Sequence, residues 1–140
     1  MKKNKIRKDV EDAAKRVYNE LGAGHEEAIY RDAMSVELQD MGYTVKTEMP
    51  VEIKYETSKG KNITIGNGRI DLYIEKEGEK AIIELKAVAP LKKGKEKEIK
   101  EQYQLKKYLK SLSLGEKNGF LINFCFPPQD EPEIISQEDN

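Results

Sequence analysis

The chain has 140 residues, of which 37% are hydrophobic and 36% are charged, and its formal net charge at pH 7 is −1. This length suits one domain with its own hydrophobic core, and the composition excludes a disordered chain. No apolar run approaches the roughly 18 residues that a membrane-spanning helix needs. The basic N-terminus lacks a following apolar stretch, so we expect no secretory signal and no membrane partner.

Charge is distributed unevenly along the chain. Residues 1–8 carry five basic groups and no acid, residues 92–110 carry eight lysines and three glutamates, and residues 126–140 carry five acids and no base. Charge alone leaves two explanations open, a basic face for nucleic acid or the solvated surface of helices and tails. The single Cys125 and single His25 exclude an internal disulfide and a zinc site of ordinary spacing. We expect a reducing, cytoplasmic location.

Two helices are predicted in the first part of the chain. Apolar residues at helical spacing predict an amphipathic helix with Asp9 as its N-cap and Gly22 after its end. A second helix is predicted from about His25 to Asp40, followed by Gly42.

Strands and one further helix follow. Alternating apolar residues predict strands, and a lysine-rich stretch predicts a helix. In chain order the elements are strands at 43–56 (interrupted by Pro50), 63–75 and 80–88, a helix at 95–112 and a strand at 120–124. The first three strands favour an antiparallel meander, and the helical crossover favours a parallel last strand. We therefore expect a mixed α/β sheet flanked by helices in a single domain, residues 1–125, and a disordered acidic tail, residues 126–140.

A hairpin around Glu77-Gly78 would align a set of polar side chains. If these two residues form the turn, which the glycine favours, Asp71 lies opposite Glu84 and Lys86 lies further along the same face. The other face is apolar and is expected in the core, with Ile70, Leu72, Ile74, Ala81, Ile83 and Leu85.

Two opposed carboxylates indicate a divalent-metal site. Like charges on facing strands are unfavourable unless a cation lies between them. Mg²⁺ suits this pair because it binds one or two carboxylates together with waters and phosphate oxygens. The ammonium of Lys86 could orient an attacking water or stabilise charge in the transition state. The alternative is a solvated hairpin face with diagonal ion pairs, Asp71–Lys86 and Arg69–Glu84.

Two helical positions are further candidates. Glu27 lies at the edge of the apolar stripe of the second helix, where it could complete the metal site or extend into water. Gln104 and Tyr108 share a face of the lysine-rich helix, and the glutamine amide could hold a water or a phosphate. Alternatively, Tyr108 belongs to the core and Gln104 to the ordinary surface.

Five segments in order resemble the GxxExxY proteins, a branch of the PD-(D/E)XK nuclease superfamily. Gly24 to Tyr30 matches the Gly-x-x-Glu-x-x-Tyr signature. The match continues at Arg69–Leu72, Ile83–Val88, Gln104–Leu109 and Gly119–Phe124. The resemblance covers about residues 8–125. It implies a restriction-endonuclease-like αβββαβ core with an extra N-terminal helix, in agreement with the predicted order of elements.

The resemblance also implies roles for individual residues. Asp71 and Glu84 look like the metal-binding acids, Lys86 like the catalytic lysine, Glu27 like the acid of the first core helix, and Gln104 and Tyr108 like the Gln-x-x-x-Tyr element of RecB-like nucleases. Many RecB-like enzymes carry a metal-binding histidine on that first helix. Here the role falls to Glu27, and we do not expect His25 to be a ligand.

We therefore expect a Mg²⁺-dependent nuclease acting on DNA, with Mn²⁺ able to substitute. The expected metal ligands are Asp71, Glu84, the carbonyl of Leu85, and Glu27; the expected phosphate contacts are Lys92, Lys93, Lys95, Lys97 and Lys100. Two alternatives stay open: an inactive nucleic-acid-binding module on the same fold, and a resolvase-like homodimer that acts on branched DNA.

Overall fold

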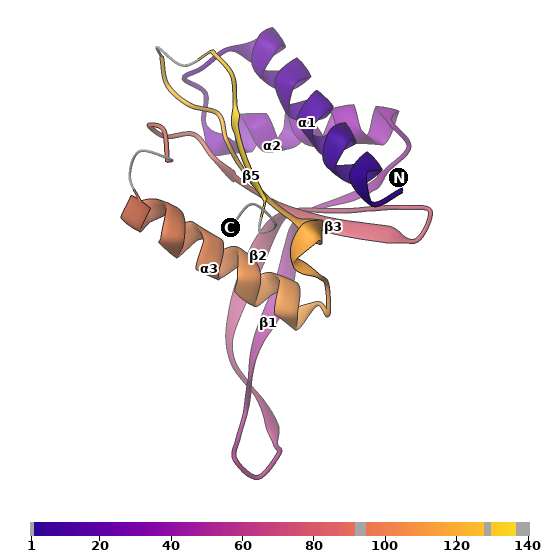
Figure 1. Ribbon diagram of the computed structural model, residues 1–140, viewed down its shortest axis with the longest axis vertical. Helices are drawn as coiled ribbons and strands as arrows, with labels where there is room; N and C mark the ends of the chain where they lie inside the picture. The colour runs from indigo at the N-terminus through magenta and orange to yellow at the C-terminus, as the bar shows by residue number, and fades with distance from the viewer. Residues whose placement is uncertain (1, 92–94, 128–129, 137–140) are drawn as a thin grey trace.

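The computed structural model describes residues 2–91, 95–127 and 130–136, which form one five-stranded sheet with helices on both faces (Figure 1). The elements are α1 (Lys2–Leu21), α2 (Glu27–Asp40), β1 (Thr44–Glu56), β2 (Asn62–Lys76), β3 (Glu79–Lys86), α3 (Lys95–Ser111), the 3₁₀ turn η1 (Glu116–Asn118), β4 (Gly119–Asn123) and β5 (Glu133–Ser136). No helix in these ranges is long and apolar enough to span a membrane.

The sheet has the mixed topology that the sequence predicts. Its strand order is β1-β2-β3-β4-β5. β1, β2 and β3 pair antiparallel, β4 returns parallel to β3 after the α3 crossover, and β5 pairs antiparallel with β4. The expected αβββαβ order, preceded by one extra helix, is confirmed, and β5 is added to it.

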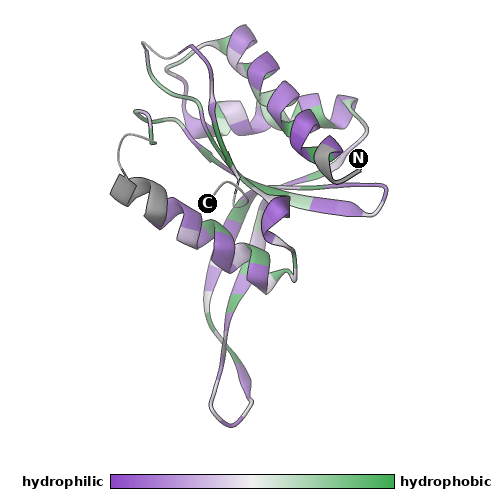
Figure 2. Ribbon diagram, in the orientation of Figure 1, coloured by the Kyte–Doolittle hydropathy of each residue, from purple (hydrophilic) through white to green (hydrophobic). Residues whose placement is uncertain are grey.

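Two apolar clusters hold the helices to the sheet, one on each face. α1 and α2 cover the first cluster, which includes Leu72 and Ile83, and α3 covers the second, which includes Ile82 and Leu105. Figure 2 shows the apolar residues gathered along the central strands, where both helical layers meet the sheet. The polar faces of the helices remain in water, so the high charge content is compatible with a dry interior.

Ile70 lies on the opposite face from the one predicted. Simple alternation groups it with Leu72, but Ile70 belongs to the cluster under α3. The reason is a break in the ladder, because the β1–β2 pairs pass from Thr47↔Leu72 to Met49↔Ile70 and skip Glu48 and Asp71. Glu48 has φ 51°, a left-handed conformation that changes the direction of the strand.

Two local predictions also need correction. Asp9 is not an N-cap, because α1 begins at Lys2 and the Asp9 carboxylate accepts a hydrogen bond of 2.8 Å from the Tyr43 hydroxyl. Pro50 does not interrupt β1, which continues through it opposite Arg69. A proline is tolerated there because β1 is the edge strand, where a missing N–H leaves no partner unsatisfied.

The acidic tail expected to be disordered contains the fifth strand. β5 pairs with β4 along Phe120↔Ser136 to Asn123↔Glu133. Ile135 is buried in the α3-side cluster, which provides the apolar contact that the tail was thought to lack. The acid Glu133 also has a structural use, because its carboxylate accepts hydrogen bonds from the N–H of Leu91 and the amide of Asn123.

Candidate active site

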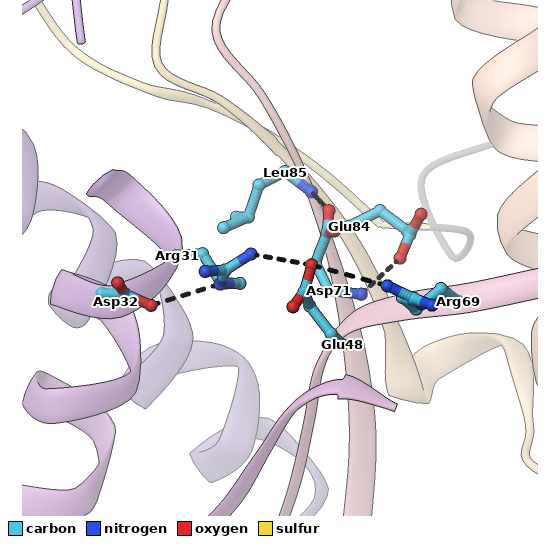
Figure 3. Close-up of polar contacts among 7 residues, drawn as sticks. All are labelled: Arg31, Asp32, Glu48, Arg69, Asp71, Glu84 and Leu85. Atoms are coloured by element: carbon cyan, nitrogen blue, oxygen red, sulfur yellow. Dashed lines mark hydrogen bonds and ion pairs between the residues drawn. The ribbon is translucent and has the colours of Figure 1, made fainter. Parts of the chain in front are cut away.

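Asp71 and Glu84 face each other across the β2–β3 hairpin. Glu77 and Gly78 form the turn with positive φ values of 52° and 84°, as a type I′ hairpin requires, and the register matches the predicted one. The β2–β3 ladder ends at Leu72↔Ile83, one step before the two acids. From there, side chains replace the ladder. The Asp71 N–H donates to Glu84 Oε1 at 3.0 Å, and the Leu85 N–H donates to Asp71 Oδ2 at 2.8 Å (Figure 3).

Both carboxyl groups have a raised pKa, which means that their ionised forms are unfavourable in the folded chain. Burial, followed by the nearby charge of Asp71, raises the pKa of Glu84 to about 8. Burial also raises the pKa of Asp71, although the Leu85 N–H and the charge of Lys86 act in the opposite direction. A nearby cation would relieve both shifts, because it favours the ionised carboxylates.

The donor set fits a hard divalent cation. Each acid uses one oxygen for a backbone N–H, and the second oxygen accepts no hydrogen bond from the described part of the chain. Mg²⁺ typically binds one or two protein carboxylates and retains several waters. Across residues 2–91, 95–127 and 130–136, no three or more His, Cys, Asp or Glu side chains are grouped in a way that could hold a metal ion, and a role of Glu27 as a third ligand beside Asp71 and Glu84 stays a prediction. The pair therefore suits an open, water-rich site better than a structural one.

Lys86 lies beside the two acids and is held by a residue that sequence reasoning missed. Its ammonium forms an ion pair of 3.1 Å with Glu101 of α3, whose side chain is only 16% exposed. Burial lowers the pKa of Lys86, but the hydrogen bond and charge of Glu101, with the charges of Glu27 and Glu84, raise it above its ordinary value overall. Lys86 therefore stays cationic at neutral pH.

Glu27 enters the site from the opposite helical layer, at the first turn of α2. Its side chain is largely exposed, yet partial burial of the carboxyl raises its pKa. The charges of Asp71 and Glu101 raise that pKa further, and the charge of Lys86 lowers it. Glu27 is therefore close enough to Asp71, Lys86 and Glu101 for their charges to change its pKa.

The other parts of the Gly-x-x-Glu-x-x-Tyr segment organise the link between α1 and α2. The Tyr30 hydroxyl donates to the Gly22 carbonyl at 2.6 Å, and its ring stacks on Phe124 with centroids 4.3 Å apart. A ring nitrogen of His25 lies 3.0 Å from the Leu21 carbonyl oxygen. Tyr30 and His25 thus have structural partners, whereas Glu27 is the member of the segment whose pKa responds to the charges of Lys86 and Asp71.

Gln104 and Tyr108 share a face of α3, as expected. The Gln104 amide donates to the Tyr108 hydroxyl at 3.0 Å. The ring of Tyr108 packs directly on Gly68 of β2, where an added Cβ would come within 2.6 Å of its hydroxyl oxygen. Between this pair and the three hairpin residues, the described ranges contain no hydrogen bond or ion pair. The pair joins α3 to β2 beside the site.

A second cluster missed by sequence reasoning lies next to Asp71. The Glu48 carboxylate is 3.2 Å from Nη1 of Arg31 and 3.9 Å from Nη1 of Arg69, and Arg31 also pairs with Asp32 at 3.2 Å (Figure 3). Arg31 lowers the pKa of Asp71 and Glu48 raises it. The only sequence signal is that Glu48 lies two residues before Pro50 in an alternating strand, which does not indicate a left-handed residue.

Of the five lysines predicted to contact phosphate, only Lys100 has a side chain within the described part of the structure. Lys92 and Lys93 lie outside the described residues, as do the side chains of Lys95 and Lys97, whereas Lys100 is exposed on α3. The side chain of Leu85 is in the core, and a role of its carbonyl oxygen as a metal ligand stays a prediction.

One comparison with known proteins found a match. A family model described as the PD-(D/E)XK nuclease superfamily matches residues 4–135. The match does not show the narrower GxxExxY branch, which stays a prediction. No curated protein and no solved structure matches the chain.

Proposed function

This chain belongs to the PD-(D/E)XK nuclease superfamily, and from that premise we propose that it is a divalent-metal-dependent nuclease that hydrolyses phosphodiester bonds in DNA. The supporting observation is the arrangement of Asp71 and Glu84, two partly buried acids that each keep one oxygen available beside a cationic lysine. Such an arrangement is costly to a fold that makes no use of it, because it concentrates like charge away from water.

The metal ion would be Mg²⁺, with Mn²⁺ able to substitute, held by Asp71, Glu84 and the Leu85 carbonyl. When bound, it would supply Lewis-acid polarisation of the phosphate and an acidified water. Lys86 would donate hydrogen bonds to the attacking water or to a phosphate oxygen, because its raised pKa keeps it charged and unable to act as a base. Glu27 would orient water from the α2 side, and Gln104 with Tyr108 would hold α3 in place beside the strands.

The proposal is tested by DNA cleavage with matched variants. Supercoiled plasmid is incubated with Mg²⁺ or Mn²⁺ and wild type, Asp71→Asn or Lys86→Ala. Removing one electrostatic group from an active site typically costs about 10²–10³-fold in rate, and we expect losses of that order. Glu20→Gln and Lys15→Ala are the controls, because both residues are exposed on α1. Equal cleavage by wild type and both site variants would contradict the assignment.

Metal binding is measured separately by titration calorimetry. We expect Mn²⁺ to bind the wild type and not Asp71→Asn. An intact metal site and tight DNA binding without cleavage of any nucleic acid would favour the inactive binding module.

Substrate form and assembly are finer expectations with tests of their own. Parallel assays with plasmid, four-way junctions and RNA distinguish DNA cleavage from junction-specific or RNA cleavage. Analytical ultracentrifugation tests the resolvase-like homodimer, which predicts a mass close to twice the chain mass of 16.0 kDa.

A further inference from the structure

A groove lies between α3 and a protruding hairpin made by β1 and β2. β2 pairs with β3 only along Leu72 to Lys76, so residues 51–68, which we call the β-arm, form a two-stranded ribbon. Figure 1 shows the β-arm extending beyond the body of the molecule, past the C-terminal half of α3. The groove is lined by Ile53, Lys54, Glu56 and Asn62 of the arm together with Lys107, Lys110 and Ser111 of α3.

The groove is basic, and its lysines are available. Lys54, Lys107 and Lys110 are all exposed, against one acid, Glu56. None of the three forms an ion pair with a carboxylate in the described ranges. By contrast, Lys106 on the same helix pairs with Glu116 at 3.8 Å. Unpaired ammonium groups gathered from two elements create a local positive field although the chain has a net charge of −1.

The chemistry of the lining suits a phosphodiester backbone. Three ammonium groups complement a row of phosphates, and the amide of Asn62 and the hydroxyl of Ser111 are neutral groups that can hydrogen-bond to phosphate or sugar oxygens. Groups of this kind make mostly sequence-independent contacts, because the backbone is the same at every step.

The groove and the candidate active site lie on two shared elements, α3 and β2. α3 contributes Glu101 to the site and Lys110 to the groove. Nine residues of helix separate them, which is about 14 Å at about 1.5 Å per residue. At about 3.4 Å per nucleotide of one strand, that distance corresponds to about four nucleotides. A strand cut beside Asp71 would reach the groove within half a helical turn.

We propose that this groove holds the sugar–phosphate backbone of the DNA to one side of the cut, about four nucleotides away. The inference rests on the proposed function for the identity of its ligand. It assigns the docking surface to Lys54, Lys107 and Lys110, in addition to the lysines at 92–100.

The test measures DNA binding without cleavage. The triple variant Lys54→Gln, Lys107→Gln, Lys110→Gln is compared with wild type by fluorescence anisotropy of a labelled 30-base-pair duplex in EDTA, at several salt concentrations. Each lost phosphate contact lowers the slope of log affinity against log salt by about 0.9. We therefore expect the slope to fall by about 2–3 and the affinity at low salt to fall at least about tenfold. The triple variant Lys15→Gln, Arg16→Gln, Lys80→Gln removes the same charge from exposed positions on α1 and β3, away from the groove, and should bind as wild type does.

Each outcome decides one question. Affinity and slope equal to wild type in the groove variant, or an equal loss in the control variant, overturn the groove. Displacement of DNA by polyglutamate at equal charge concentration also overturns it, in favour of an acidic protein partner. A wild type that binds DNA through the groove but never cuts it upholds the groove and rejects the nuclease. A groove variant that binds and cleaves DNA as the wild type does upholds the nuclease and rejects the groove.

Discussion

At the scale of single residues, the ion pair between Lys86 and Glu101 determines where the ammonium group of Lys86 lies. Lys86 lies among Glu27, Glu84 and Glu101, and only Glu101 is within ion-pair distance of it in the described ranges. Glu101 is itself largely buried, so the pair is weakly screened by water. We infer that Glu101 is a positioning residue that fixes the direction of the lysine ammonium.

A double-mutant cycle tests this positioning role. Glu101→Gln should lower the turnover rate roughly tenfold with little change in KM. The reason is that residues in contact typically have an interaction energy of about 0.5–3 kcal/mol. In the Lys86→Ala background the same change should have almost no further effect. Steady-state cleavage of a fluorescent duplex gives both constants. Additive losses in the two backgrounds would mean that Glu101 acts by some route other than Lys86.

At the scale of the element, the site depends on an interruption of regular strand structure. The β1–β2 ladder skips Glu48 and Asp71, and the β2–β3 ladder stops at Leu72↔Ile83. Asp71 is thereby released from strand pairing and accepts the Leu85 N–H through its side chain. Strained residues persist where the surrounding structure fixes them, and they often lie at functional sites.

The strain at Glu48 predicts an inverted preference between glycine and alanine. At φ 51° an L-residue pays about 1–2 kcal/mol that glycine avoids, so Glu48→Gly should be more stable than Glu48→Ala by about 1 kcal/mol. Both variants lose the same contacts with Arg31 and Arg69, so these cancel in the comparison. Urea unfolding monitored by circular dichroism measures the difference.

Glu52 provides the matched control on the same strand. It is exposed and does not have a positive φ, and both of its variants lose the same hydrogen bond from Thr64. There, Glu52→Gly should be less stable than Glu52→Ala, by about 0.5–1 kcal/mol. The same order of stability at both positions would show that Glu48 carries no strain.

At the scale of the whole molecule, the raised pKa values of Glu84 and Asp71 make the stability of the fold depend on pH. The pKa of Glu84 is raised to about 8 from an ordinary value of 4.5, so the folded chain binds a proton more tightly than the unfolded chain. Between these two values the folded state holds more protons, and the free energy of unfolding therefore falls as pH rises. Asp71 contributes in the same direction, because burial raises its pKa too.

Glu84→Gln should remove much of this pH dependence. In EDTA, the wild type should lose more stability between pH 5 and pH 8 than Glu84→Gln does, by at least about 1.4 kcal/mol, the equivalent of one pKa unit. Urea unfolding at pH 5, 6.5 and 8 measures the difference, and Glu20→Gln on the exposed face of α1 is the control. Parallel pH profiles for all three proteins would contradict a desolvated Glu84.

The sequence by itself determined the hairpin and the order of the elements. Glu77-Gly78 specifies a two-residue turn because glycine tolerates positive φ, and a turn of known length fixes the register that brings Asp71 opposite Glu84. Asp71, Glu84 and Lys86 could thus be placed together from one local hairpin, whereas Glu27 depends on a helix face and stays a prediction as a site residue. Gln104 and Tyr108 could be paired in the same way, because helix geometry places residues four apart on one face.

Only the tertiary structure decided which distant groups surround those residues. Glu101, Glu48 and Arg31 reach the site from three separate elements, and no local period relates them to the hairpin. The β5 strand was likewise missed, because its few apolar residues become useful only where β4 offers an open edge. Turn chemistry and periodicity act over a few neighbouring residues, so they can be predicted from the sequence. Interactions between distant charges and the pairing of edge strands depend on distances that exist only after the chain has folded.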